Sequence, residues 1–449
     1  MIVDFWQATL ALVVLLPGAI FVVLALLWLM GWVPRERVIS RLTHLTFSLI
    51  VLALTAMIWH LSVSGASSIV ITFGNWFAVH DYHFPLALLA DRLSLPFLLL
   101  TAALSGLIGK FSATYLHRER GFLRFFLLLQ LFAFGSLLAF AAGSLDLMAA
   151  GWEIVGITSV LLIAFFQQRP APVENGLRVF AIYRACDIGL LVGVFALHHW
   201  AGTASFTNGF PSLHETQSAM IGLLLLFAAA GKAAQIPFSG WLPRAMEGPT
   251  PSSAIFYGAI SIHAGAYLLL RVQPLLAQSM LGSSAVVVIG VLTAIQGSIV
   301  GRASADAKTS LAYASLTQVG LIFVEIGLGW RRLAVVHILG HATVRTLQFL
   351  RAPSMLHDYH KMHAAIGGEL TPAGRHLAKL FPERFQLWLY RWAMDRACLD
   401  TILDRFIVDP LMRLSRLFAM LDYLGLDGPW RRPEEVPPSM QNVARQRGE

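Results

Sequence analysis

Long apolar stretches, each near the length of a membrane-spanning helix, recur along the whole of this sequence. A helix needs about 20 predominantly apolar residues to cross the hydrocarbon core of a bilayer. Hydrophobic residues make up 57% of the chain and charged residues 13%, whereas a water-soluble domain carries about 25% charged residues. The sequence therefore predicts an all-α polytopic membrane protein and excludes soluble and disordered classes. About eleven stretches qualify, near 5–30, 43–63, 92–115, 121–143, 145–166, 175–200, 218–242, 251–273, 280–301, 307–328 and 333–351.

The stretches divide the chain into three regions. Residues 1–90 hold two spans and most of Ile69–Asp91, whose β-branched and aromatic residues predict a short hairpin on the membrane surface. Residues 91–352 hold the remaining spans and form the expected core. Residues 353–449 are basic, and apolar residues at helical spacing over 386–425 predict amphipathic helices that lie in the interface or dock on a partner. The Pro-, Glu- and Arg-rich end predicts a flexible tail.

The net charge of the chain is +8, which is typical of positive-inside topology and of contact with anionic lipid. We therefore expect the lipid bilayer as a partner and no nucleic acid. The two cysteines, Cys186 and Cys398, lie far apart and match no metal-ligand spacing, so no metal site is expected. The sequence also contains no dinucleotide fingerprint and no obvious haem pair, so no cofactor is expected.

Two spans contain helix-breaking residues. Pro237 lies inside the seventh, and Pro249 and Pro251 open the eighth. Proline removes a backbone donor and clashes with the preceding turn. A broken helix at membrane depth is tolerated only where protein or a water-filled cavity covers the freed backbone groups, and such breaks often mark ion and substrate sites. The alternative is a kink that serves packing alone, since proline is common in transmembrane helices.

A few ionisable residues lie inside the predicted spans, where they are costly unless they face a cavity or one another. Glu153 and Lys232 invite pairing, because each would lower the penalty that the other carries alone. Burial favours the neutral form of a lysine, so a moving glutamate would change the proton affinity of Lys232. The alternative is a static ion pair that holds helices together. Arg184 and Asp187 are three residues apart and are interpreted as a structural ion pair.

A second group of polar residues lies within the eleventh span. His337, His341 and Arg345 are four residues apart, which stacks them on one helix face about 6 Å from neighbour to neighbour. Histidine picks up and releases protons near neutral pH, whereas arginine does not. The row predicts a wet proton path in which Arg345 is a fixed positive gate that favours the neutral form of His341. The alternative is histidines that are hydrogen-bonded to neighbouring helices. The other candidates for the path are Tyr257, His263 and Lys308.

Together these motifs resemble the proton-translocating antiporter-like subunits: subunit L of respiratory complex I, the large Mrp antiporter subunit, and the membrane subunit DabB of DAB inorganic-carbon transporters. The resemblance covers Asp91 to about Leu350. Its motifs are Asp91-Arg92-Leu93-Ser94, Gly151-Trp152-Glu153-Ile154-Val155-Gly156, Gly231-Lys232-Ala233-Ala234-Gln235-Ile236-Pro237, Trp241-Leu242, Ala245-Met246-Glu247-Gly248-Pro249-Thr250-Pro251, Asp306-Ala307-Lys308, Leu311-Ala312-Tyr313-Ala314-Ser315, Gln318, His337 and His341.

The resemblance implies inverted five-helix repeats with broken helices in the middle, and it implies that Glu153 and Lys232 are the paired charge switch. The chain departs from the family where a histidine is usual and Tyr257 stands, and where a lysine is usual and Arg345 stands. The membrane pattern also stops after Leu350, so the second repeat is expected to be incomplete. This favours a shortened DabB-type subunit, whose family partner is a large soluble DabA-like zinc protein resembling β-carbonic anhydrase.

The leading hypothesis is a subunit of the cell inner membrane that conducts H⁺, or Na⁺, and couples the gradient to inorganic carbon uptake. It would not be an enzyme by itself. One alternative is an antiporter-like subunit of a respiratory NADH-quinone oxidoreductase or Mrp-type complex, with other antiporter-like subunits as partners. An alternative of another class is a non-conducting membrane anchor that holds a catalytic partner through residues 353–430.

Overall fold

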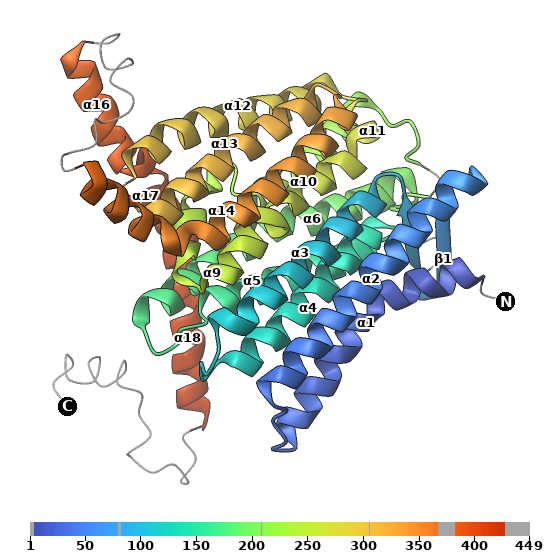
Figure 1. Ribbon diagram of the computed structural model, residues 1–449. Coiled ribbons are helices and arrows are strands. Elements are labelled where there is room, and N and C mark those ends of the chain that lie inside the picture. The colour runs from blue at the N-terminus through green and yellow to red at the C-terminus, as the bar shows by residue number, and fades with distance from the viewer. Residues whose placement is uncertain (1–3, 80–81, 208, 305, 367–381, 427–449) are drawn as a thin grey trace. The chain divides into compact units, whose positions relative to one another are not determined.

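The computed structural model describes residues 4–79, 82–207, 209–304, 306–366 and 382–426 (Figure 1). Among these residues, ten helices are long and apolar enough to cross a membrane. The first six long helices and the strands are α1 (Phe5–Leu29), α2 (Glu36–Ser64), β1 (Ser68–Val79), β2 (Tyr82–Asp91), α3 (Ser94–Tyr115), α4 (Phe122–Ala141), α5 (Leu145–Ile163) and α6 (Pro170–Ala201). The fold is therefore an all-α polytopic bundle with one surface hairpin, as predicted.

The middle of the chain alternates long helices with short pieces. These elements are α7 (Glu215–Lys232), η1 (Phe238–Gly240), α8 (Trp241–Arg244), η2 (Ala245–Glu247), α9 (Thr250–Ser253), η3 (Ala254–Ala259), α10 (Ser261–Arg271) and α11 (Gln273–Leu276), followed by α12 (Met280–Ala303), α13 (Ala307–Gly327) and α14 (Arg331–Ile366). Ten rather than eleven helices qualify as spans, because the predicted seventh span is interrupted where α7 ends at Lys232, and the 18 residues of α7 include its polar first turn.

The C-terminal region is helical, as its amphipathic pattern predicts, but it is not one helix. Its elements are α16 (Glu383–Met394), η4 (Arg396–Cys398), α17 (Leu399–Leu403), η5 (Asp404–Val408) and α18 (Asp409–Leu426). The chain divides into two compact units at Leu403. In the first unit, Asp400 of α17 accepts hydrogen bonds from Arg244 (2.7 Å) and Arg396 (3.1 Å). The predicted tail over 429–449 lies outside the described residues.

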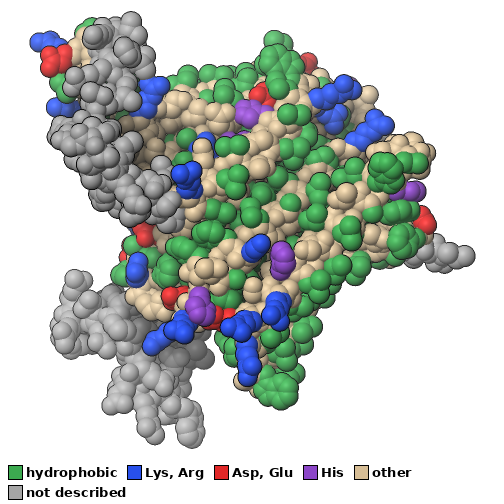
Figure 2. Space-filling view, in the orientation of Figure 1, with side chains coloured by type: hydrophobic (Ala, Val, Ile, Leu, Met, Phe, Trp, Pro, Cys, Tyr) green, Lys and Arg blue, Asp and Glu red, His purple; other side chains and the backbone are tan. Residues whose placement is uncertain are grey.

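The long helices pack in sequence-adjacent pairs, and glycines allow the closest contacts. Between α12 and α13, a Cβ atom on Gly290 would lie 2.5 Å from the carbonyl oxygen of Gly320, and the reverse distance is 2.6 Å. Small residues let transmembrane helices approach this closely. The segment Thr250–Arg271 is completely buried, whereas only 28% of the apolar window of α1 is buried. The broken helix is therefore surrounded by other elements, and on the face that Figure 2 shows, apolar side chains are spread along the long helices.

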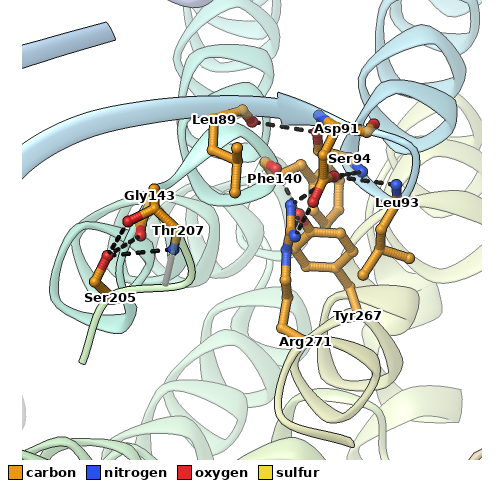
Figure 3. Close-up of polar contacts among 10 residues, drawn as sticks. All are labelled: Leu89, Asp91, Leu93, Ser94, Phe140, Gly143, Ser205, Thr207, Tyr267 and Arg271. Carbon is orange, nitrogen blue, oxygen red and sulfur yellow. Dashed lines mark hydrogen bonds and ion pairs between the residues drawn. The ribbon is translucent and has the colours of Figure 1, made fainter. Parts of the chain in front are cut away.

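The hairpin marks one side of the bundle, which we call the hairpin side. Its strands are antiparallel, with Ser68 paired to Asp91 and Val79 to Tyr82. Gln7 at the start of α1 donates a hydrogen bond to the Val70 carbonyl (2.7 Å). The connection between α6 and α7 reaches the same side, where the Ser205 hydroxyl donates to the Gly143 carbonyl (Figure 3). The other end of the helices is called the opposite side.

A polar network ties the end of the hairpin to α10 (Figure 3). The Asp91 carboxylate accepts the backbone N–H of Ser94 (2.7 Å), which satisfies a free donor at the start of α3. The same carboxylate accepts two hydrogen bonds from the Arg271 guanidinium (2.6 and 3.1 Å). Arg271 also donates to the Tyr267 hydroxyl, which donates to the Phe140 carbonyl. One carboxylate thus fixes the hairpin, α3, α4 and α10 together.

Candidate functional site

The interruption after α7 leaves backbone groups that neighbouring residues satisfy. Ala234 adopts a left-handed conformation (φ 52°), and the Ile236–Pro237 peptide bond is cis. The Trp241 indole donates to the Gly231 carbonyl (2.9 Å), and the Ile236 N–H donates to the Thr293 hydroxyl (3.0 Å). Protein groups therefore cover the break, as a broken helix at membrane depth requires.

The next break has a different local cause. Pro249 and Pro251 flank the first residue of α9, where a missing N–H does no harm to the helix. The chain then forms a π-helical turn, η3, before α10 begins. Such turns are rare and frequently occur at functional sites. Tyr257 lies on this turn, is buried, and its hydroxyl has no hydrogen-bond partner among the described residues.

Lys232, the last residue of α7, is held by aromatic and carbonyl groups. Its side chain is 1% exposed, and its amine donates to the Trp152 carbonyl (3.0 Å). The amine lies over the rings of Trp152 (4.8 Å) and Tyr183 (4.5 Å), which attract a cation. A Cβ atom on Gly156 would lie 2.9 Å from the amine. Gly156 thus leaves the space that the amine occupies.

Lys232 and three other ionisable groups form one cluster. Arg184 hydrogen-bonds the Glu153 carboxylate and also Asp187 (2.7 Å). Asp187 accepts the indole N–H of Trp152 (2.6 Å), whose carbonyl binds Lys232. The contacts therefore run from Glu153 to Arg184, then to Asp187 and Trp152, and end at Lys232. With all four groups ionised, the two carboxylates balance the two cations.

This arrangement corrects one prediction. We expected Glu153 to pair with Lys232, but among the described residues the carboxylate pairs with Arg184 instead. Arg184 reaches Glu153 from α6, which packs directly against α5. Arg184 and Glu153 are each 36% exposed, so their pair lies nearer the surface of the cluster than Lys232. The expected pair between Arg184 and Asp187 is present, but it belongs to this cluster rather than standing alone.

Ring contacts lead from the lysine to the second break. Tyr183 packs edge-on against Trp241 (5.2 Å between ring centres), and Trp241 packs against Tyr257 (5.6 Å). Lys232 and Tyr257 are therefore linked through two aromatic side chains. The sequence pattern gives no reason to choose Tyr183, because which aromatic ring lies beside an amine depends on how the helices pack.

The hydrogen-bond pattern assigns the protons of two buried histidines. His263 Nδ1 faces the Ala259 carbonyl, which only accepts, so this nitrogen carries the hydrogen. In neutral His263, Nε2 is then an acceptor, and it receives a hydrogen bond from His341 Nδ1 (3.0 Å). His341 Nε2 is left as a buried base with no partner among the described residues. Nε2 of His341 is therefore the ring nitrogen of this pair that is open to a proton.

The remaining residues of the predicted path lie in different surroundings. His337 lies 6.5 Å from His341 between ring centres, as the spacing predicts. Arg345 is buried and donates to Gln348 (2.7 Å), and it has no hydrogen bond to the histidines among the described residues. Lys308 is half-buried in the first turn of α13, and within the described ranges it has no hydrogen bond to the row.

Glu325 is a site residue that the sequence analysis did not include. It accepts from or donates to His337 Nδ1 (2.8 Å), and Gln318 lies 3.0 Å from His337 Nε2. The signal was present, since Glu325 is an ionisable residue inside the predicted tenth span, 307–328.

These features define a class: a polytopic helical membrane protein in which one broken helix carries a buried lysine and the other a buried histidine. A family model described as "NADH:quinone oxidoreductase/Mrp antiporter, TM" matches residues 142–380, more than half of the chain. A second model, described as "NADH-Ubiquinone oxidoreductase (complex I), chain 5 N-terminus", matches residues 76–126. The chain therefore belongs to the NADH:quinone oxidoreductase/Mrp antiporter transmembrane family.

Individual relatives agree with this assignment. NADH-quinone oxidoreductase subunit L of Mycobacterium tuberculosis (strain CDC 1551 / Oshkosh) is 35% identical over 292 residues, which are 64% of this chain and 46% of that protein. NADH-ubiquinone oxidoreductase chain 5 of Cryptococcus neoformans var. grubii is 35% identical over 305 residues, 67% of this chain and 46% of that protein. The chain thus spans about half the length of the curated relatives it matches.

Two solved structures share the fold. The Mrp complex from Dietzia sp. DQ12-45-1b matches with a TM-score of 0.64 and 23% identity, over 77% of this chain and 37% of that chain. The membrane-bound sulfane sulfur reductase, an archaeal respiratory membrane complex, matches with a TM-score of 0.65 and 20% identity, over 76% of this chain and 70% of that chain.

Proposed function

We propose that this chain is an ion-translocating subunit of a multi-subunit membrane complex, with H⁺ as the ion. One observation carries the proposal: Lys232 is buried at the end of a broken helix, and Trp152 connects it by hydrogen bonds to Asp187 of the charge cluster. A lysine amine there can hold or release a proton, and its charge decides whether the cluster is neutral.

The charge cluster regulates the lysine in this proposal. When Arg184 holds Glu153, the cluster favours a charged Lys232. A shift of Glu153 or Arg184 changes the field at the amine, and Lys232 releases its proton. The proton then moves by way of Tyr257, His263 and His341 toward the hairpin side, with Arg345 as a fixed charge and Lys308 as a carrier on the opposite side.

The distribution of basic residues supports an orientation of the protein in the membrane. Cytoplasmic connections of membrane proteins carry an excess of Lys and Arg. The opposite side has more of them in or next to its connections than the hairpin side, so we assign the opposite side to the cytoplasm and the protein to the inner membrane. The opposite-side residues are Arg35, Arg37, Arg118, Arg120, Arg169, Arg302 and Lys308, and the hairpin-side residues are Arg92, Arg271, Arg331 and Arg332.

The partner is a separate part of the proposal. The relatives and structures named above are respiratory and Mrp-type proteins, which favours a complex with other antiporter-like subunits. Coupling to inorganic carbon uptake through a DabA-like zinc protein has no support from these relatives. Purification by a tag on this chain, followed by mass spectrometry, separates the two: respiratory subunits favour the first, and a zinc protein resembling β-carbonic anhydrase favours the second.

Glu153→Gln tests the regulating role of the cluster and separates transport from a mere anchor. We expect proton flux into liposomes that contain the purified complex to fall about tenfold, the size of a typical coupling between two sites. Assembly should be intact, because glutamine keeps the size of the side chain. The matched control is Glu215→Gln, the same change at an exposed position. Unchanged flux for Glu153→Gln and for Lys232→Ala would leave the anchor as the better account.

A further inference from the structure

Glu325 carries a mostly buried carboxylate, to which the proposed path gives no role. It lies two residues before the end of α13, and its side chain is 13% exposed. One carboxylate oxygen is 2.8 Å from His337 Nδ1, and the other is buried with no hydrogen-bond partner within the described part of the chain. The helix that packs most extensively on α13, α12, contains no ionisable residue before Arg302. His337 is therefore the group that explains why this carboxylate is buried here.

With the amide oxygen of Gln318 facing the ring, the contacts of His337 fit a pair that holds one extra proton. Both ring nitrogens face oxygen atoms, Nδ1 toward Glu325 and Nε2 toward Gln318 (3.0 Å). Each contact needs one hydrogen, and an amide oxygen cannot supply it. Either His337 is an imidazolium beside an ionised Glu325, or His337 is neutral and Glu325 is protonated. The two forms differ only in the position of one proton, which can move between nitrogen and oxygen.

The pair of His337 and Glu325 lies at the hairpin-side end of the histidine row. The connection after α13 lies on the hairpin side, since a Cβ atom on Gly329 would contact Gln273 of α11 at 3.6 Å. His337 is 22% exposed, whereas His341, one turn further into the bundle, is buried. Glu325 is thus nearer the hairpin-side surface than the base at His341 Nε2.

We propose that Glu325 is the proton outlet of the row on the hairpin side, an inference that rests on the proposed function. The imidazolium of His337 transfers the proton on Nδ1 to Glu325, so that an N–H bond breaks and an O–H bond forms. The carboxylic acid then releases this proton to water at the hairpin-side surface. Neutral His337 regains a proton from His341, and the carboxylate is ready for the next transfer.

Glu325→Gln in the complete complex tests this role, with flux measured in liposomes. We expect flux to fall about 100-fold, Glu325→Asp to retain most of it, and added formate to restore part of it in Glu325→Gln by acting as a replacement carboxylate. Formate should not restore flux in Lys232→Ala. Glu215→Gln, an exposed glutamate on the same side, is the matched control and also reports any leak that formate causes.

The possible outcomes distinguish the outlet from the rest of the account. Unchanged flux in Glu325→Gln, together with loss of flux in Lys232→Ala, overturns the outlet and leaves the proposed function standing. Unchanged flux in Lys232→Ala overturns the proposed function itself. Reduced flux in Glu325→Gln without recovery in formate, accompanied by loss of assembly on a native gel, shows a purely structural role and also overturns the outlet.

Discussion

Lys232→Ala lowers the proton flux of the reconstituted complex by about 100-fold or more, because a positioned proton-transfer group typically contributes that much. The variant leaves Glu153, Arg184 and Asp187 in place but removes the buried amine at the helix break. Lys232→Arg keeps the positive charge and cannot release a proton. We therefore expect the arginine variant to lose flux as well, while its complex assembles.

The matched control for this prediction is Lys110→Ala, which makes the same change at an exposed lysine of α3. Flux is followed with a pH-sensitive dye trapped inside the liposomes, and assembly is followed by the yield of the tagged complex. Flux in Lys232→Ala equal to that of Lys110→Ala would contradict the role of the amine.

Asp91→Asn lowers the free energy of unfolding by about 3 kcal/mol, the cost of breaking a buried ion pair by removing one partner. The variant leaves Arg271, which is 6% exposed, without its carboxylate. It also weakens the hydrogen bond that begins α3 at Ser94. Unfolding of the purified protein by SDS in mixed micelles measures the change, and Asp395→Asn, at an exposed position, is the control.

The same pair predicts a pH dependence. Burial raises the pKa of Asp91, but the charge and hydrogen bonds of Arg271 and Ser94 outweigh it and hold the pKa below its ordinary value. The unfolded chain therefore binds a proton at a higher pH than the folded protein does. The stabilisation is complete above about pH 4, near the ordinary aspartate value, and is lost as the pH falls through the lower folded value. The difference between the wild type and Asp91→Asn should shrink over that range, and a constant difference would contradict this account.

Periodicity and composition were sufficient for the spans, the hairpin and the two helix breaks. Each of these is a local property, since apolar length, β-branched residues and proline act on the segment that contains them. The partner of Glu153 could not be predicted in this way. It depends on which neighbouring helix brings a cation closest, and α6 brings Arg184 nearer than α7 brings Lys232.

Two other features of the structure could not be predicted from the sequence pattern. The amphipathic region is interrupted where Arg396, Ala397 and Cys398 have positive φ angles of 52° to 63°. No glycine or proline stands at these positions to indicate that the helix ends there. The direction of Arg345 toward Gln348 rather than His341 is a choice among side-chain conformations that spacing on a helix does not determine. Glu325, by contrast, could have been found from its charge and its place in a span.

The central claim is that Glu153 acts on Lys232 through Arg184, and a double-mutant cycle on proton flux tests it most directly. Flux is measured for the wild type, Glu153→Gln, Arg184→Gln and the double variant in one liposome preparation. Groups that act as a unit have strongly non-additive effects. We predict that the double variant loses no more flux than the worse single variant. Losses that multiply, so that two tenfold effects give about a hundredfold effect, would contradict the claim.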